Sequence, residues 1–300
     1  MGTVSWRELL AETRGRLGAR GAHGGHGSSG NEAQWIVEEA SGMSGPELVF
    51  GLDEPATERG VARLDGMVAR RLAGEPLQYV LGRWGFRSLD LLVDRRVLIP
   101  RPETEQLVDL ALRELDRLRP GIEGPPCVVD LGSGSGAIGL SVAAERPGTD
   151  VWCVDASPDA VAVTRANLAG LGMAGARVRV AEGSWWSALP DELAGRVHLV
   201  ISNPPYVAVD DPLPAEVADW EPVAALVPGP TGLEAVNEIL AGAFSWLAPD
   251  GVLLLEIGET QGSAVLRAAV EAGFTDVATH LDLTGRERFV IARSGAPAST

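Results

Sequence analysis

The sequence Asn203-Pro204-Pro205-Tyr206 follows directly after a mostly apolar stretch. Residues 197–201 predict a buried strand, so these four residues form the loop at its carboxyl end. The two prolines stiffen the loop and remove two backbone donors, which leaves carbonyl oxygens exposed to a ligand. The Asn203 side chain can accept and donate, and Tyr206 adds an aromatic wall. Such a loop suits a planar group that bears an NH2, although an ordinary proline-rich turn would show the same pattern.

A second stretch with chemical potential runs from Asp130 to Gly136, between a predicted strand and a predicted helix. Its glycines allow a ligand to approach the backbone closely. The spacing also satisfies a loose dinucleotide pattern that ends at Ala137, so a hydride-transfer enzyme is one candidate. Asp130 would repel a pyrophosphate but suit a cationic amino group, and Gly136 comes one residue too early for a helix-packing glycine. Both features favour S-adenosylmethionine. The predicted cofactor-binding residues here are Asp130, Gly132, Ser133, Gly134, Ser135 and Gly136.

Two further residues extend this predicted cofactor site. Asp155 ends the next predicted strand, about 20 residues after the glycine loop, where an acidic residue binds ribose hydroxyls in such folds. Its alternative role is to cap the following helix. Trp185 follows the third strand and could stack on an adenine ring, whereas Trp186 is expected to pack in the core.

The elements that must position these residues alternate between strands and helices. This order predicts an α/β fold with a mostly parallel seven-stranded sheet and helices on both faces, with the last two strands antiparallel. The predicted strands are 127–131, 151–155, 176–181, 197–202, 252–256, 274–281 and 286–292. The predicted helices of this part are 137–145, 158–170, 233–247 and 262–272, after a helix that begins at Pro102.

The N-terminal part reads differently, with helices predicted at 3–17, from a cap at Asn31, at Pro46–Phe50 and at 55–73. Between the first two, residues 21–30 have the composition of a flexible segment. A disordered loop is favoured there over a metal site at His23 and His26. We therefore predict a helical substrate-recognition domain at 1–74, a β-hairpin linker at 75–102 and a cofactor-binding domain at 103–300.

Composition narrows the function classes. The net charge of −16 and the absence of a long basic run argue against direct nucleic-acid binding. No apolar run reaches the roughly 18 residues of a membrane span, and the N-terminus lacks a signal-peptide pattern. A cytoplasmic protein without membrane contact is expected. Cys127 and Cys153 have no metal-binding spacing, so no metal site is predicted.

Taken together, the motifs resemble the HemK family of class I, S-adenosylmethionine-dependent N-methyltransferases. The glycine loop and the Asn203–Tyr206 loop carry part of the resemblance, which covers about residues 31 to 293. The remaining motifs are Glu75–Tyr79 with Leu81-Gly82, Ile99–Glu105, Glu221–Leu226 and Leu254–Gly258. The resemblance implies a Rossmann-like fold. It also implies methylation of the side-chain nitrogen (N5) of the glutamine in the Gly-Gly-Gln loop of class I peptide-chain release factors, with S-adenosylhomocysteine as the second product.

The resemblance also assigns roles to single residues. It implies that Gly132 to Gly136 wrap the methionine part of the cofactor, that Asp155 holds the ribose, and that Trp185 lies against the adenine. Asn203 and the Pro204 carbonyl would hold the substrate amide, with Pro205 and Tyr206 beside it. The chain departs from the family pattern at Ser184, where an aspartate is more usual, and in the glycine-rich segment 21–30. A monomer is expected.

Other readings remain open at this point. DNA and RNA amino-methyltransferases use the same Asn-Pro-Pro-Tyr loop, but the acidic charge and the helical N-terminal domain argue against them. A non-enzymatic binding module with a degenerate cofactor site is disfavoured because Asp130, the glycines and Asn203 are all present.

Overall fold

The computed structural model describes residues 4–19 and 29–295, which fold as two compact units. The helical unit comprises Met1–Arg83 with Pro214–Trp220, and the sheet unit comprises Trp84–Leu213 with Glu221–Thr300. The chain therefore passes between the two units three times. The three-part division at residues 74 and 102 stays a prediction. The segment 20–28, with His23 and His26, lies outside the described residues.

Short amphipathic helices build the helical unit. They bury a cluster of apolar side chains that includes Trp6, Ile36 and Leu64. Ser5 and Glu8 form a reciprocal capping box at the start of the first helix. The predicted cap at Asn31 is wrong, because the second helix already begins at Ser29. The helices are α1 (Trp6–Gly18), α2 (Ser29–Ser41), α3 (Gly45–Gly51), α4 (Glu58–Leu72), α5 (Leu77–Leu81) and α9 (Ala215–Ala218).

The predicted hairpin is confirmed as a two-stranded sheet of β1 (Arg83–Phe86) and β2 (Leu89–Leu92). Arg87 lies at its turn with a φ of 51°.

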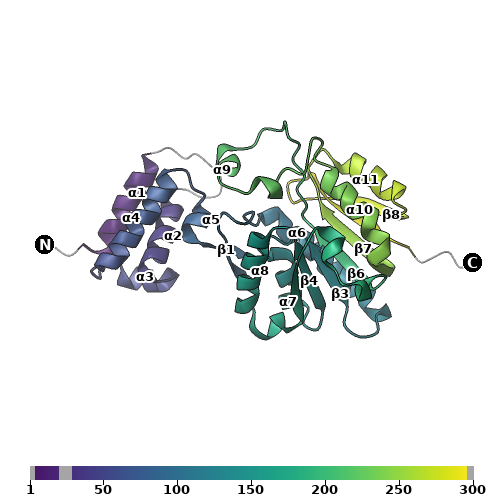
Figure 1. Ribbon diagram of the computed structural model, residues 1–300. Coiled ribbons are helices and arrows are strands. Elements are labelled where there is room, and N and C mark those ends of the chain that lie inside the picture. The colour runs from purple at the N-terminus through teal and green to yellow at the C-terminus, as the bar shows by residue number, and fades with distance from the viewer. Residues whose placement is uncertain (1–3, 20–28, 296–300) are drawn as a thin grey trace, which may run out of the picture. The chain divides into compact units, whose positions relative to one another are not determined.

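The sheet unit is built on a seven-stranded sheet in the order β5-β4-β3-β6-β7-β9-β8 (Figure 1). The strands from β5 to β7 run parallel, whereas β9 pairs antiparallel with both β7 and β8. The predicted α/β fold is therefore confirmed. The strands are β3 (Cys127–Leu131), β4 (Asp150–Asp155), β5 (Val178–Glu182), β6 (Val197–Ser202), β7 (Leu247–Glu256), β8 (Asp276–Leu281) and β9 (Glu287–Arg293).

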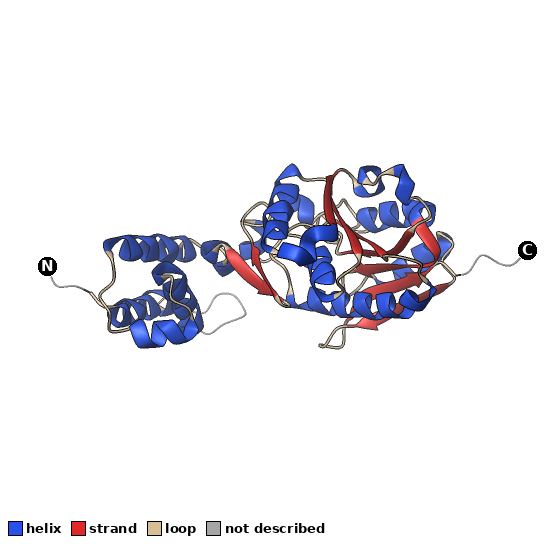
Figure 2. Cartoon of the chain, turned by 90° about the horizontal axis from the view of Figure 1, so that it is seen from below, coloured by secondary structure: helices blue, strands red, loops and turns tan. Residues whose placement is uncertain are grey.

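Helices cover both faces of this sheet, so its central strands are buried on both sides (Figure 2). Helices α10 and α11 pack on the face that carries Val129 and Leu131. Helix α7 packs on the opposite face, which carries Asp130. The helices are α6 (Pro102–Leu118), α7 (Ala137–Glu145), α8 (Pro158–Gly170), α10 (Glu234–Trp246) and α11 (Gly262–Glu271). Short 3-10 turns lie at Arg119–Gly121, Gly172–Arg177, Trp185–Ala188, Asp191–Leu193 and Val223–Ala225.

The strand order reverses next to β3. The chain leaves β3 towards β4 on one side, while β6 lies on the other side. Open α/β sheets bind their ligands at such a switch point, outside the carboxyl ends of the strands. Leu131 pairs with Ser202, so Gly132 and Asn203 begin neighbouring loops at this edge. The topology thus brings the two predicted motifs together.

Within residues 4–19 and 29–295, no helix combines the length and the apolar character that a membrane crossing requires.

Candidate active site

The glycine loop has a backbone that only glycine adopts readily. Gly132, Gly134 and Gly136 have φ angles of 75°, 56° and 83°. A Cβ atom added at Gly134 would meet no protein atom within 4 Å, so this part of the loop faces open space. An open, side-chain-free backbone at the switch point fits the close approach of a cofactor.

Helix α8 holds the loop in shape. The Thr164 hydroxyl donates to the Gly134 carbonyl over 2.8 Å, and Asn167 donates to the Ser135 carbonyl over 2.8 Å. Ser133 and Ser135 are both buried. Because these hydrogen bonds are made within the protein, the loop is formed before any ligand binds.

Asp130 lies fully buried beneath the loop. Its Oδ2 accepts from the Gly139 N–H over 2.9 Å, so the carboxyl group serves the first turn of α7, which lacks a side-chain cap. Its Oδ1 has no hydrogen-bond partner among the described residues. Burial raises the pKa of Asp130 to about 7. The unpartnered oxygen fits the predicted attraction of a cationic amino group.

Gly139 was missed in the sequence. A Cβ there would lie 2.5 Å from the Cys153 Sγ and 3.1 Å from the Asp130 Oδ2, so only glycine allows α7 to pack this closely on β3 and β4. The helix-packing glycine therefore does exist, five residues beyond Gly134. Gly134, Gly136 and Gly139 have the spacing of the dinucleotide pattern, which would have been found by starting the pattern at Gly134. The exclusion of a dinucleotide on the basis of Gly136 was therefore wrong, and the charge of Asp130 is the remaining sequence feature that favours S-adenosylmethionine.

Asp155 at the end of β4 faces the glycine loop. Its two carboxylate oxygens accept from the backbone N–H groups of Gly134 and Ser157, over 2.8 and 2.9 Å. The alternative role of helix cap belongs instead to Ser157, whose hydroxyl accepts from the Ala160 N–H. Burial raises the pKa of Asp155. A carboxylate can accept about four hydrogen bonds, so Asp155 keeps capacity for ribose hydroxyls.

The two tryptophans after β5 have different surroundings. The Trp185 ring lies 3.5 Å from the position of a Cβ on Gly132, and its Nε1 donates to Glu238 over 2.8 Å. It therefore borders the glycine loop, and its contact with the adenine stays a prediction. The Trp186 ring instead stacks on Trp246, with centroids 6.3 Å apart, and packs against the core beside α10.

The Asn203–Tyr206 loop is anchored on both sides. The Ser202 hydroxyl donates to the Leu131 carbonyl over 2.6 Å, which ties the end of β6 to β3. The Gln261 side chain donates to the Tyr206 carbonyl over 2.9 Å. The loop is therefore held at a fixed place beside the glycine loop.

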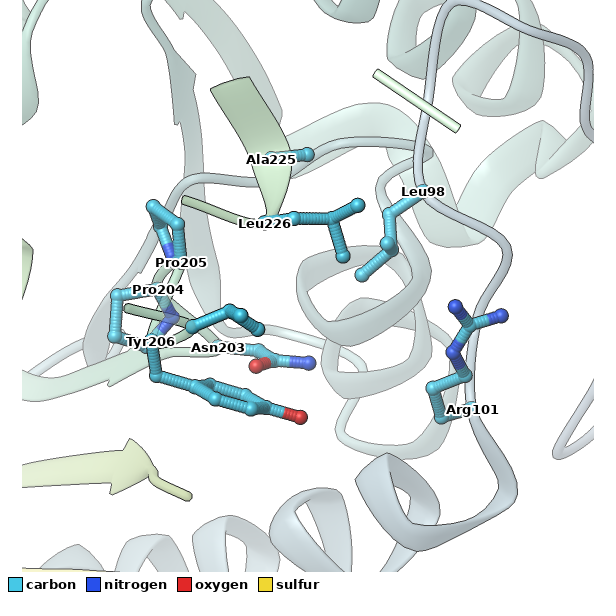
Figure 3. A pocket seen from close by; sticks show the side chains of 9 residues that line it. Leu98, Arg101, Asn203, Pro204, Pro205, Tyr206, Ala225 and Leu226 are labelled. Atoms are coloured by element: carbon cyan, nitrogen blue, oxygen red, sulfur yellow. The ribbon is translucent and has the colours of Figure 1, made fainter. Parts of the chain in front are cut away.

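A pocket opens on this loop, with about 50 Å³ of free space, which is room for a few water molecules. Figure 3 shows the Asn203 amide and the Tyr206 hydroxyl pointing into it from one side, with Leu98 and Arg101 on the other. A space of this size admits a small planar group such as a carboxamide. The lining residues are Leu98, Arg101, Asn203, Pro204, Pro205, Tyr206, Val207, Ala225 and Leu226.

Thr104 and Glu256 lie within two motifs of the family resemblance, Ile99–Glu105 and Leu254–Gly258, but the polar chain that they form behind Asn203 was not predicted. The Asn203 Nδ2 donates to the Thr104 Oγ1 over 3.3 Å, and the Thr104 hydroxyl donates to the Glu256 Oε2 over 2.8 Å. Thr104 and Glu256 are only 4% and 1% exposed, and burial raises the pKa of Glu256 to about 7. A second signal was the position of Glu256, a glutamate at the end of an otherwise apolar strand.

Known proteins resemble this chain over most of its length. Residues 8–82 match the family described as PrmC N-terminal domain, and residues 115–215 match the methyltransferase small domain. A protein named release factor glutamine methyltransferase from Burkholderia pseudomallei is 42% identical over 86% of this chain and 89% of its own length. One of the same name from Geobacter sulfurreducens is 37% identical over 96% of each chain.

A solved structure supports the fold independently. The catalytic domain of hMettl16, determined with the MAT2A 3′UTR hairpin 6, superposes with a TM-score of 0.53 over 81% of this chain and 84% of that chain, at 14% identity. At this identity the likeness concerns the fold alone. The relatives of high identity, the two matched domains and the two loops that meet at the switch point agree with one another. The chain belongs to the release factor glutamine methyltransferase family.

Proposed function

We propose that this protein transfers a methyl group from S-adenosylmethionine to the side-chain nitrogen, N5, of the glutamine in the Gly-Gly-Gln loop of class I release factors. The observation that carries the proposal is the juxtaposition of the Asn203 amide and the Pro204 backbone in a small pocket beside the glycine loop. The names of the relatives supply the substrate class.

The cofactor is assigned to the glycine loop on the chemistry of the residues there. The positive φ angles of Gly132, Gly134 and Gly136 shape the loop, and its backbone faces open space at Gly134. Asp155 provides a carboxylate for the ribose hydroxyls, and Trp185 borders the loop at Gly132. Asp130 contributes negative charge below the loop, next to the predicted position of the cofactor amino group. When bound, S-adenosylmethionine supplies an electrophilic methyl group on a sulfonium.

The chain's own task is to present the glutamine nitrogen. A carboxamide nitrogen is a poor nucleophile because its lone pair is delocalised, with an amide rotation barrier of about 18–20 kcal/mol. The Asn203 Oδ1 and the Pro204 carbonyl accept its two N–H bonds and orient the nitrogen. These oxygens also stabilise the positive charge that develops on nitrogen. Because a strong base is then not required, the proton leaves the nitrogen only afterwards.

The proposal is tested by incubating the protein with methyl-labelled S-adenosylmethionine and a purified release factor, followed by mass spectrometry of the Gly-Gly-Gln peptide. We expect one added methyl group on the glutamine side chain. A release factor with glutamate in place of that glutamine is the matched control and should stay unlabelled. Label in DNA or RNA oligonucleotides, with none in the release factor, would contradict the proposal.

We also propose that the helical unit binds the release factor away from the pocket. The unit has its own buried core around Trp6 and Leu64, while the sheet unit carries both loops of the site. Deleting residues 1–74 should abolish methylation of an intact release factor but leave S-adenosylhomocysteine binding measurable. Full activity of the shortened protein on the intact release factor would refute this role.

A further inference from the structure

The Asn203 side-chain amide ends in an oxygen and a nitrogen of similar shape, so it has two possible orientations in the pocket. Only the oxygen can accept an N–H of a substrate carboxamide. If the amide turned over, its NH2 would meet the NH2 of the substrate, and two donors would face each other. The proposed function therefore needs a device that keeps one orientation.

The structure contains such a device in the polar chain behind Asn203. The Thr104 hydroxyl carries one hydrogen, which it donates to the Glu256 Oε2 over 2.8 Å. An ionised carboxylate is an acceptor only, so Thr104 cannot donate to Asn203 at the same time. Thr104 must therefore accept from the Asn203 Nδ2, which lies 3.3 Å away. The Asn203 Oδ1 is then left for the pocket.

Burial makes this ordering selective. Thr104 and Glu256 are almost fully buried, in the first turn of α6 and at the end of β7. Bulk water therefore does not compete for the hydroxyl, and a buried donor left without an acceptor is unfavourable. Thr104 lies 99 positions before Asn203 and 152 positions before Glu256 in the sequence, so the arrangement depends on the tertiary fold.

We propose that Thr104 and Glu256 are positioning residues that fix which end of the Asn203 amide faces the substrate. The proposal rests on the proposed function, because it concerns how Asn203 accepts from the glutamine amide. Glu256 sets the direction of the Thr104 hydroxyl, and Thr104 sets the direction of the amide. Neither residue touches the substrate.

Protonation of Glu256 would reverse the direction of the two hydrogen bonds that join Asn203, Thr104 and Glu256. A protonated carboxyl group can donate to Thr104, whose hydroxyl is then free to donate to the Asn203 Oδ1 and so turn the amide. Burial raises the pKa of Glu256 to about 7, and neighbouring charges act on it in both directions. The charged and titratable groups that face Glu256 are Arg288, Glu103, Arg101 and Tyr206.

The first test compares Thr104→Val, which keeps the shape and removes the hydroxyl, with Thr104→Ser, which keeps the hydroxyl. In single-turnover methylation of a release factor, we expect the valine variant to be about tenfold slower, as for one lost hydrogen bond. The serine variant should stay within about twofold of the wild type. S-adenosylhomocysteine affinity should be unchanged in both. A valine variant with the wild-type rate would overturn the proposal.

The pH profile separates positioning from simple structural support. In the wild type and in Thr104→Ser, kcat/KM should rise with pH through about 7, as Glu256 loses its proton. Thr104→Val should show a smaller rise, since without the hydroxyl the protonation of Glu256 no longer affects the Asn203 amide. Glu256→Gln offers a second route if the valine variant does not fold: its amide can donate to Thr104 at any pH, so its rate should be low without that rise. A wild-type pH profile of kcat/KM in both Thr104→Val and Glu256→Gln would refute the proposal that Glu256 acts on Asn203 through Thr104.

A third measurement is independent of activity, so that it still decides if the proposed function fails. The sequence contains four asparagines, Asn31, Asn167, Asn203 and Asn237, so selective 15N labelling gives few side-chain NH2 signals. The Asn203 signal is assigned by its loss in Asn203→Asp. We expect it to shift with pH near 7 in the wild type and not in Thr104→Val. If it shifts equally in both, the hydroxyl does not control the amide.

Discussion

Arg101, which lines the pocket, donates from its Nη2 to the Glu221 Oε1 over 2.6 Å, although the two residues are 120 positions apart in the sequence. The Glu221 carboxylate also accepts from the Ile99 N–H over 3.1 Å and is only 5% exposed. The pair thus ties the segment that enters α6 to the segment that follows α9. The shape of the pocket depends on this connection.

Arg101→Ala should lower the free energy of unfolding by roughly 3 kcal/mol, because it leaves the buried Glu221 charge without its cation. Urea unfolding measures this. Arg96→Ala is the matched control, since Arg96 and its partner Asp94 are both 38% exposed, and a surface pair contributes under about 1 kcal/mol. Equal losses of unfolding free energy in the two variants would show that the Arg101–Glu221 pair contributes no more than a surface ion pair.

Asn203→Ala should reduce the single-turnover rate by about 10²–10³, which is typical for the loss of one preorganised transition-state contact. S-adenosylhomocysteine affinity should change little, because we assign cofactor binding to the glycine loop and Asp155. Asn203→Asp keeps an acceptor and should retain some activity. A wild-type rate in Asn203→Ala, or a loss explained by weaker cofactor binding, would remove Asn203 from its proposed role.

Gly134→Ala should weaken S-adenosylhomocysteine binding by at least about tenfold, since it forces a side chain to a φ of 56° and into the space assigned to the cofactor. Gly148→Ala is the control: Gly148 also has a positive φ and open surroundings, but it lies in the turn after α7. Calorimetry should show normal binding in the control. NAD should not bind the wild type, and comparable NAD affinity would refute the cofactor assignment.

Asp130 predicts a specific pH dependence of stability. Burial raises its pKa from 3.8 to about 7, so the folded state binds the proton more tightly than the unfolded state. Asp130 is therefore stabilising at low pH, and this contribution is lost as the pH rises from about 4 to 7, by at most about 1.4 kcal/mol per pH unit. Asp130→Asn does not titrate. Urea unfolding of the ligand-free proteins should show wild-type stability falling relative to this variant over that range, and parallel curves would contradict the assignment.

The sequence predicted the alternating elements of the sheet unit because its central strands are apolar runs bounded by glycine and proline. Strand β7 shows the limit of such signals. Pro249, Asp250 and Gly251 look like a turn, so the strand was expected to begin at residue 252, but β7 begins at Leu247 and passes through Asp250 with a φ of 60°. Pairing of Leu247 with Val197 outweighs the local preference. Tertiary contacts decide such cases.

The sequence predicted the two loops of the candidate site, whose residues are close in sequence, and the structure places the loops side by side. The roles of their residues stay predictions. The motifs Ile99–Glu105 and Leu254–Gly258 contain Thr104 and Glu256, but the contacts of these two residues with each other and with Asn203 could not be found in this way. Thr104 looks like an ordinary residue in a helix start, and its partners come from two distant loops or strands. The second helix begins at Ser29, two residues before the expected cap at Asn31. This start was missed because serine and glycine at 29 and 30 have the composition of a flexible segment, not of a helix.

Residues 214–220 fold with the helical unit although they lie between the Asn203–Tyr206 loop and Glu221 in the sequence. Within that unit, Arg71 pairs with Glu32 over 2.9 Å and with Glu216 over 2.9 Å. The helical unit is therefore encoded in two separate stretches of the gene. A chimaera that exchanges it between relatives must carry both stretches, because a graft of residues 1–83 alone would set Arg71 against a foreign side chain at position 216.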